Sequence, residues 1–157
     1  LSDAGFSGGN VLESSAGTGY FLGFCPKELQ KKIKFFAIEK DSISGKILKL
    51  LYPDADVQIT GFEQANLPFG EFDLVIGNPP FGQQKVYDKG LDSQLGKFNL
   101  HNFFLGKNTV ALKEGAIGVF VVTNRFLDSN NSEFRKWLTS AEGGNTDFIG
   151  AIRLPSN

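Results

Sequence analysis

Runs of apolar residues alternate with stretches of helical spacing along most of the chain. The apolar runs predict strands at residues 10–13, 33–38, 57–60, 72–76, 117–123 and 148–154. The helical spacing predicts helices at residues 19–23, 42–51, 99–113 and 132–141. The runs at 72–76 and 117–123 are almost continuously apolar, which is typical of strands buried on both faces. This alternation predicts an α/β fold with a mostly parallel sheet and helices on both of its faces.

A polar, glycine-containing stretch at residues 82–97 interrupts this pattern and predicts a long loop. Long loops in compact domains are usually functional or disordered. The sequence shows no internal repeat, low-complexity tract or linker, so we expect residues 1–157 to form a single domain. In open parallel sheets, ligands bind beyond the carboxyl ends of the strands. The motifs described below fall at those ends.

Composition and charge narrow the class of protein. Hydrophobic residues make up 41% and charged residues 21% of the chain, which is typical of a globular protein. The apolar runs are shorter than the ~20 residues of a membrane helix, and the start of the chain does not resemble a signal peptide. Cys25 is the single cysteine, so an internal disulfide is excluded, and we expect a cytoplasmic protein without a membrane partner.

The net charge of −1 is unusual for a protein that holds DNA by itself, because neutralising phosphates usually requires a basic face. The sequence contains no Met and does not begin with one, which predicts that it is part of a longer protein. Strong binding to a nucleic acid would then need a local basic patch or segments outside this sequence.

A glycine-containing turn at residues 11–19 follows the first predicted strand. Gly17 and Gly19 let the backbone turn tightly and approach a ligand, although a plain strand-to-helix turn would look the same. The turn lacks the Lys-Ser/Thr ending and the third glycine of phosphate-binding motifs. Glu39 ends the second predicted strand 20 residues after Gly19, where an acid can accept hydrogen bonds from ribose hydroxyls. Alternatively, Glu39 is a solvated charge and Asp41 caps the next helix.

The glycine turn and the acid that leads into it resemble the S-adenosylmethionine-binding motif of class I methyltransferases, which have a Rossmann-like fold. The resemblance implies that Glu13 lies near the methionine part of the cofactor. It also implies that the backbone of Ala16, Gly17 and Gly19 wraps around the cofactor. Ser14 departs from the family pattern, because adenine methyltransferases often have proline at this position.

The same family places two cofactor-binding residues after the third strand. One is an apolar residue that packs on the adenine ring, and the other is an acid that binds the adenine amino group. The resemblance implies these roles for Phe62 and Glu63. The acid stands at Glu63 rather than at Gly61, where one alignment would place it.

The most specific motif is Asn78-Pro79-Pro80-Phe81, directly after the predicted strand at 72–76. An aryl amine is a poor nucleophile because its lone pair is delocalised into the ring. The side-chain oxygen of Asn78 and the backbone carbonyl of Pro79 can accept the two amino hydrogens and direct the lone pair at a sulfonium methyl group. The prolines fix the direction of the carbonyl, and Phe81 offers a flat face for stacking on a base. The alternative is a rigid turn with Phe81 in the core.

This motif resembles the Asn-Pro-Pro-Phe motif of N6-adenine DNA methyltransferases, whereas related protein-glutamine methyltransferases have Asn-Pro-Pro-Tyr. The likeness continues through residues 97–100 and 113–123. In that family the aromatic residue at Phe98 helps to enclose a flipped base, although Phe98 equally fits a place in the core. The resemblance implies a restriction-modification type of enzyme that transfers methyl groups from S-adenosylmethionine to N6 of adenine in DNA. Methylation of a protein glutamine amide or of RNA adenine, and a cofactor-binding remnant without activity, remain alternatives.

Three further expectations concern what surrounds this site. We expect the loop at 82–97 to close over DNA and to be mobile without it. We expect the rest of the parent chain to supply an upstream cofactor-binding segment and a target-recognition domain. The sequence predicts no metal site, and neither His101 nor Cys25 is assigned a catalytic role.

Overall fold

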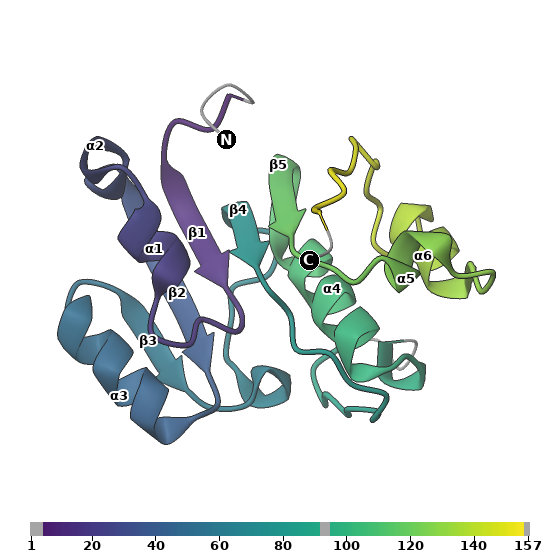
Figure 1. The fold of residues 1–157 in the computed structure, drawn as a ribbon, viewed down its shortest axis with the longest axis horizontal. Helices are drawn as coiled ribbons and strands as arrows, with labels where there is room; N and C mark the ends of the chain where they lie inside the picture. The colour runs from purple at the N-terminus through teal and green to yellow at the C-terminus, as the bar shows by residue number, and fades with distance from the viewer. Residues whose placement is uncertain (1–4, 92–94, 156–157) are drawn as a thin grey trace. The chain divides into compact units, whose positions relative to one another are not determined.

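The computed structural model describes residues 5–91 and 95–155. The chain divides into two compact units, Leu1–Val121 and Val122–Asn157. The first unit contains a five-stranded sheet in the order β3-β2-β1-β4-β5, in which all neighbouring strands are parallel (Figure 1). This arrangement confirms the predicted α/β fold with a parallel sheet. That residues 1–157 act as one domain stays a prediction.

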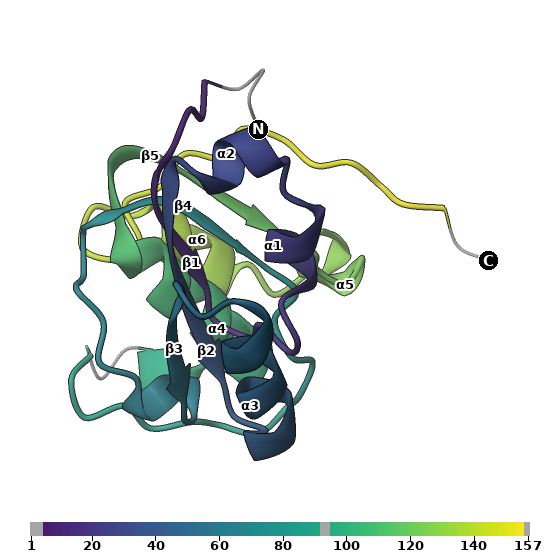
Figure 2. The same ribbon diagram turned by 90° about the vertical axis from the view of Figure 1, so that its left-hand side faces the viewer.

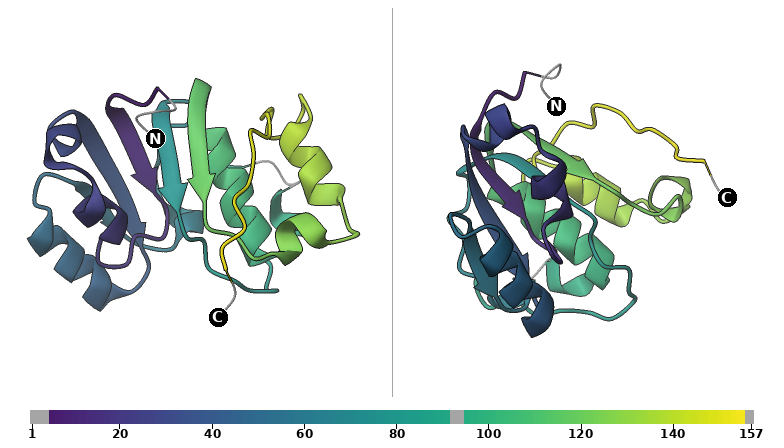
Figure 3. Two further views of the ribbon diagram at one scale, coloured as in Figure 1. Left: turned by 45° about the horizontal axis from the view of Figure 1, so that its top comes forward. Right: turned by 60° about the vertical axis from the view of Figure 1, so that its left-hand side comes forward.

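Four of the five strands begin within one residue of their predicted positions. The strands are β1 (Gly9–Glu13), β2 (Ile33–Glu39), β3 (Asp56–Ile59), β4 (Phe72–Gly77) and β5 (Leu112–Phe120). β4 is largely buried, as its continuous apolar run predicts. Figure 3 shows the arrowheads of β1, β4 and β5 pointing the same way, so the ends of these strands reach one edge of the sheet.

The fifth strand differs from the prediction of a buried strand at 117–123. It starts at Leu112 and ends at Phe120, and its residues are half-buried or exposed. β5 is the last strand in the order of the sheet, so among the described residues it pairs with β4 alone and lacks a second neighbouring strand. The pairing of β4 with β5 also shifts register between Phe72 and Leu74, and Gly115 has a φ of 75°. These irregularities extend the strand through polar residues that the apolar pattern leaves out.

Helices cover both faces of the sheet in the first unit. They are α1 (Tyr20–Phe24), α2 (Lys27–Gln30), α3 (Ser42–Leu51) and α4 (Leu100–Ala111), with 3₁₀ turns at Phe62–Gln64 and Leu95–Lys97. In Figure 2, α1 and α3 lie on one side of the sheet. Leu22 and Leu48 of these helices join Val11, Phe35 and Leu74 of the strands in one apolar cluster.

The other face of the sheet carries the alternate side chains of the strands. There Phe36 and Phe72 meet edge to face, with ring centroids 5.2 Å apart. Phe103 and Phe104 of α4 pack against Phe62 of the 3₁₀ turn after β3. α4 therefore supports the segments that leave the carboxyl ends of the strands.

The second unit contains two short helices, α5 (Arg125–Asp128) and α6 (Glu133–Thr139). Phe134 and Trp137 of α6 are buried with their rings stacked, and this confirms the helix predicted at 132–141 in a shorter form. The strand predicted at 148–154 is wrong, because this segment is irregular and its apolar side chains are exposed. The described part of the second unit contains no strand with which an apolar run could pair.

In the described part of the chain, none of the helices has the length and apolar character needed to span a bilayer.

Candidate active site

The loops that follow β1, β2 and β4 bring the predicted site residues to one edge of the sheet. Leu12 of β1 lies beside Phe36 of β2 on one side and beside Val75 of β4 on the other. The three strands are parallel, so the glycine turn after β1, the end of β2 at Glu39 and the Asn-Pro-Pro-Phe motif after β4 all lie at this edge (Figure 1). This edge is where open α/β sheets bind ligands.

The glycine turn has the backbone conformation that its sequence predicts. Gly17 and Gly19 have φ angles of 55° and 87°, which side chains other than glycine rarely adopt. At Gly19 a Cβ atom would also lie 2.6 Å from the side chains of Leu48 in α3 and Tyr52 just after it. Ala16 is buried, and its N–H donates to a backbone carbonyl at the end of β2 (3.0 Å). The turn is therefore held close to β2 and α3.

Glu39 holds the glycine turn directly. One of its carboxylate oxygens accepts a hydrogen bond from the N–H of Gly17 (2.7 Å), and the other accepts from the N–H of Asp41 (2.7 Å). Asp41 in turn accepts from the N–H of Ser44 and caps α3, as one alternative predicted. A carboxylate has about four acceptor positions, so Glu39 keeps capacity for further donors. Its contact with a ribose stays a prediction.

Glu13 is buried at the end of β1, with 2% of its surface exposed. Burial, assisted by the nearby charge of Glu39, raises the pKa of its carboxyl group from 4.5 to about 8. Among the described residues, no group donates a hydrogen bond to its Oε2 atom. A buried acceptor of this kind fits a cationic ligand group, such as the ammonium of a methionine moiety, which would favour the ionised form.

We expect the cofactor-free protein to lose stability as the pH rises from 4.5 to about 8, because of Glu13. In this range the unfolded chain ionises Glu13 while the folded protein keeps its proton, so the free energy of unfolding falls with pH. The pKa shift corresponds to a loss on the order of 5 kcal/mol. Glu13→Gln stays neutral and should remove this slope. Urea unfolding of both proteins across this pH range measures the effect, and parallel pH profiles would contradict it.

The Asn-Pro-Pro-Phe motif follows the end of β4, and both its amide side chain and its aromatic side chain are accessible. The side chain of Asn78 is exposed and Pro79 is buried. Phe81 is 57% exposed, and its ring centroid lies 5.5 Å from that of His101 in α4. Burial lowers the pKa of His101, which disfavours the charged form of the ring that packs beside Phe81.

A hydrogen bond joins the glycine turn to this motif. The hydroxyl of Ser15 donates to the backbone carbonyl of Asn78 (3.0 Å), across 63 residues of sequence. The bond involves the backbone of Asn78 and leaves its side-chain amide free to meet a substrate. The predicted cofactor half and the predicted catalytic half of the site are therefore in direct contact.

The 3₁₀ turn after β3 contains Phe62 and Glu63. Phe62 is buried, and its ring centroid lies 4.9 Å from that of Phe104. The carboxylate of Glu63 lies beside the Cα of Gly61, in the space that a side chain at Gly61 would fill. An acidic side chain at position 61 or at position 63 would thus reach the same space beside Gly61. The contacts of Phe62 and Glu63 with an adenine ring stay predictions.

The structure also reveals contacts that the sequence did not predict. The side-chain amide of Asn108 in α4 donates to the hydroxyl of Ser14 (2.8 Å), and both residues are buried. Adenine methyltransferases often have proline at the position of Ser14, and a proline could not accept this hydrogen bond. The serine at this position therefore has a specific partner, Asn108 of α4. A signal for this contact existed in the sequence, because Lys107 and Asn108 are polar residues inside an otherwise largely apolar helix.

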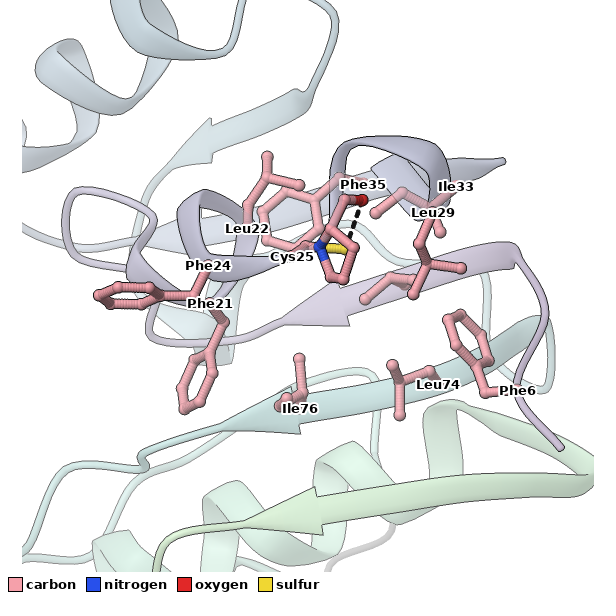
Figure 4. Close-up of a pocket in the computed structure, with 12 residues that line it drawn as sticks. Phe6, Phe21, Leu22, Phe24, Cys25, Leu29, Ile33, Phe35, Leu74 and Ile76 are labelled. Atoms are coloured by element: carbon pink, nitrogen blue, oxygen red, sulfur yellow. Dashed lines mark hydrogen bonds between the residues drawn. The ribbon is translucent and has the colours of Figure 1, made fainter. Parts of the chain in front are cut away.

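Metal-binding clusters and cavities are the other places where a chain can carry out chemistry. Within residues 5–91 and 95–155, no cluster of three or more His, Cys, Asp or Glu side chains is arranged to hold a metal ion. An apolar cavity of about 360 Å³ lies between α1, α2 and the sheet (Figure 4). Cys25 lines this cavity with aliphatic and aromatic side chains, and burial raises the pKa of its thiol. The cavity lining has no charged group for acid–base chemistry.

Comparison with known proteins gives consistent matches. Residues 24–143 match the family described as Eco57I restriction-modification methylase. Defense against restriction protein B of Escherichia phage P1 is 32% identical over 151 residues, which are 94% of this chain and 6% of that protein. The Type II methyltransferase M.TthHB8I of Thermus thermophilus is 28% identical, over 87% of this chain and 34% of that protein. The chain thus spans about a third or less of the length of these relatives.

Solved structures show the same fold at low sequence identity. A structure described as a class I S-adenosylmethionine-dependent methyltransferase from Listeria monocytogenes superposes with a TM-score of 0.63 and 18% identity, over 80% of this chain and 42% of that chain. A TehB-like methyltransferase from Corynebacterium glutamicum gives a TM-score of 0.52 and 18% identity, over 80% of this chain and 65% of that chain. The first unit therefore has the Rossmann-like fold of class I methyltransferases.

Proposed function

Because the chain belongs to the Eco57I restriction-modification methylase family, we propose that it transfers methyl groups from S-adenosylmethionine to N6 of adenine in DNA. The observation that carries this proposal is the hydrogen bond between Ser15 and Asn78, which holds the glycine turn against the Asn-Pro-Pro-Phe motif. A methyl donor bound at the turn and an amine bound at the motif would be neighbours there.

Four groups of the chain would hold the cofactor. Glu13 would face the cationic methionine end, and the backbone of Ala16, Gly17 and Gly19 would pass beside it. Glu39 has remaining acceptor capacity for the ribose hydroxyls. The turn with Phe62 and Glu63 would meet the adenine ring and its amino group. The bound cofactor supplies an electrophilic methyl group on a sulfonium.

Asn78 and Pro79 would prepare the attacking amine. The side-chain oxygen of Asn78 and the carbonyl of Pro79 accept the two N6 hydrogens, which returns the lone pair to the nitrogen. The amine held by these two acceptors would be aimed at the methyl group that the bound cofactor supplies, with the neutral thioether of the cofactor as the leaving group. The nitrogen then loses one proton to water, so the chain needs no strong base. Phe81, supported by His101, would stack on the extruded base.

Phe81 favours adenine in DNA as the substrate, because related enzymes that methylate a protein glutamine amide have tyrosine at the position of Phe81. Binding of the duplex would depend on the rest of the parent protein. The net charge of −1 gives this chain little general attraction to phosphates, and the matched relatives are far longer. The loop at 82–97 would close over the DNA; its residues 92–94 lie outside the described residues.

The full-length parent protein with methyl-labelled S-adenosylmethionine tests this function. DNA, RNA and a protein extract are offered separately, and the label is located after digestion. We expect label on N6 of DNA adenine. Label on protein or RNA would keep the mechanism and refute the substrate. Absence of label from all three would favour a cofactor-binding protein without catalytic activity.

A further inference from the structure

Lys107 of α4 is a lysine with only 1% of its surface exposed. Lysine is almost never fully buried unless its charge is paired. Its ammonium donates to the backbone carbonyl of Phe62 (2.6 Å) and to the carboxylate of Asp88 (2.6 Å). The same ammonium lies 4.7 Å from the centroid of the Phe62 ring, a cation–π distance.

These contacts join three segments of the site. Phe62 belongs to the turn that precedes β4 and also carries Glu63. Asp88 belongs to the segment that follows the Asn-Pro-Pro-Phe motif, and its side chain is 9% exposed. The second oxygen of Asp88 accepts from the N–H of Gly90 (2.8 Å), so its carboxylate also shapes the backbone of that segment.

The surroundings of Lys107 make a purely stabilising role a poor explanation. Burying an ion pair costs desolvation that its attraction barely repays, and an apolar pair of similar size is often as stable. A buried pair does fix geometry, because breaking it leaves an uncompensated charge. α4 also contacts Phe81 through His101 and Ser14 through Asn108, so one helix reaches the segments that follow β1, β3 and β4.

We propose that Lys107 is a positioning residue that locks the segment around Asp88 to the turn around Phe62. This proposal rests on the proposed function, in which the turn binds the cofactor and the segment lies beside the methyl acceptor. Through Lys107, the loop next to the substrate and the adenine end of the cofactor site keep one relative placement. Loss of the ammonium would release both.

Lys107→Met and Asp88→Asn in the full-length parent protein test this inference, with Lys113→Met as the matched control. Lys113 forms the same kind of ion pair with Asp73, at the opposite end of β4 and half-exposed. The measurements are the dissociation constant for S-adenosylmethionine by calorimetry and the rate of tryptic cleavage after Lys85 and Lys89. Neither measurement needs a methyl acceptor.

We expect Lys107→Met to raise both the dissociation constant and the cleavage rate about tenfold, as the loss of a charged hydrogen bond implies. Asp88→Asn should raise chiefly the cleavage rate, because Lys107 still binds Phe62. Lys113→Met should change neither. If Lys107→Met does not fold, Asp88→Asn against Lys113→Met decides through the cleavage rate.

Equal effects of Lys107→Met and Lys113→Met on both measurements would refute the positioning role. A parent protein that binds the cofactor and methylates no DNA would refute the proposed substrate, while both measurements on Lys107 would still stand. A parent protein without affinity for the cofactor would refute the proposed function and, with it, the link from Lys107 to a cofactor site.

Discussion

Replacing Asn78 by alanine is expected to slow methyl transfer by about 10²- to 10³-fold, while the affinity for S-adenosylmethionine stays unchanged. The side-chain oxygen is one of two acceptors that would hold the amino group with its lone pair towards the methyl group. Positioned polar groups of this kind act on the transition state more than on binding. The exposed side chain of Asn78 makes no hydrogen bond on which the fold depends, because its contact with Ser15 uses the backbone.

Single-turnover rates and cofactor calorimetry on the full-length protein separate these two effects. Asn130→Ala is the matched control, since Asn130 is an exposed asparagine in the second unit. The control should retain the rate of the unsubstituted protein. A loss of cofactor affinity in Asn78→Ala that matches its loss of rate would show that Asn78 supports the cofactor site rather than the amine.

The second large effect is expected at Glu39. Glu39→Gln should weaken the binding of S-adenosylmethionine by about 10- to 100-fold, because hydrogen bonds to charged acceptors contribute ~1.5–3 kcal/mol. A glutamine keeps the shape of the side chain but presents one acceptor oxygen in place of two. Either the N–H of Gly17 or that of Asp41 then loses its partner, and the proposed ribose contact weakens as well.

Calorimetric titration with S-adenosylmethionine measures this change. Glu71→Gln serves as the control, because Glu71 is an exposed acid directly before β4, at the end of the strand opposite to its carboxyl end. Its affinity should equal that of the unsubstituted protein. If Glu39→Gln also binds with unchanged affinity, neither the ribose role nor the anchoring of the glycine turn matters for the cofactor.

Local signals explain which elements the sequence predicted well. The helix at 42–51 was predicted to the residue, because Asp41 caps its start and Pro53 follows its end. The strand predicted at 148–154 failed because an apolar run forms a strand only where a partner strand accepts it. β5 was misplaced at its start because Leu112 pairs with Phe72 of β4, and the polar residues after Leu112 lie where the register between the two strands shifts.

The candidate site shows the same limit. The types and order of Glu13, Glu39 and Asn78 could be predicted from motifs, since each stands at the end of an apolar strand or directly after it. The bond between Ser15 and Asn78 and the ion pair between Lys107 and Asp88 were not readable, because they depend on how distant segments pack. The anchoring role of Glu39 was missed for this reason too.

The central place of β1 has a consequence for the order of folding. β1 pairs with β2, which follows it closely in sequence, and with β4, which comes much later. The hydrogen bond from Ser15 to Asn78 shows the distance along the chain, because it joins residues 63 positions apart. Closing the longer loop is the slower event, because distant segments must meet before their contacts repay the lost entropy. A chain with β1 paired on one side alone would have the glycine turn without the Asn-Pro-Pro-Phe motif beside it. A ligand that binds where these segments meet would therefore stabilise the finished fold by mass action, and we expect it to contribute little before β1 and β4 have paired.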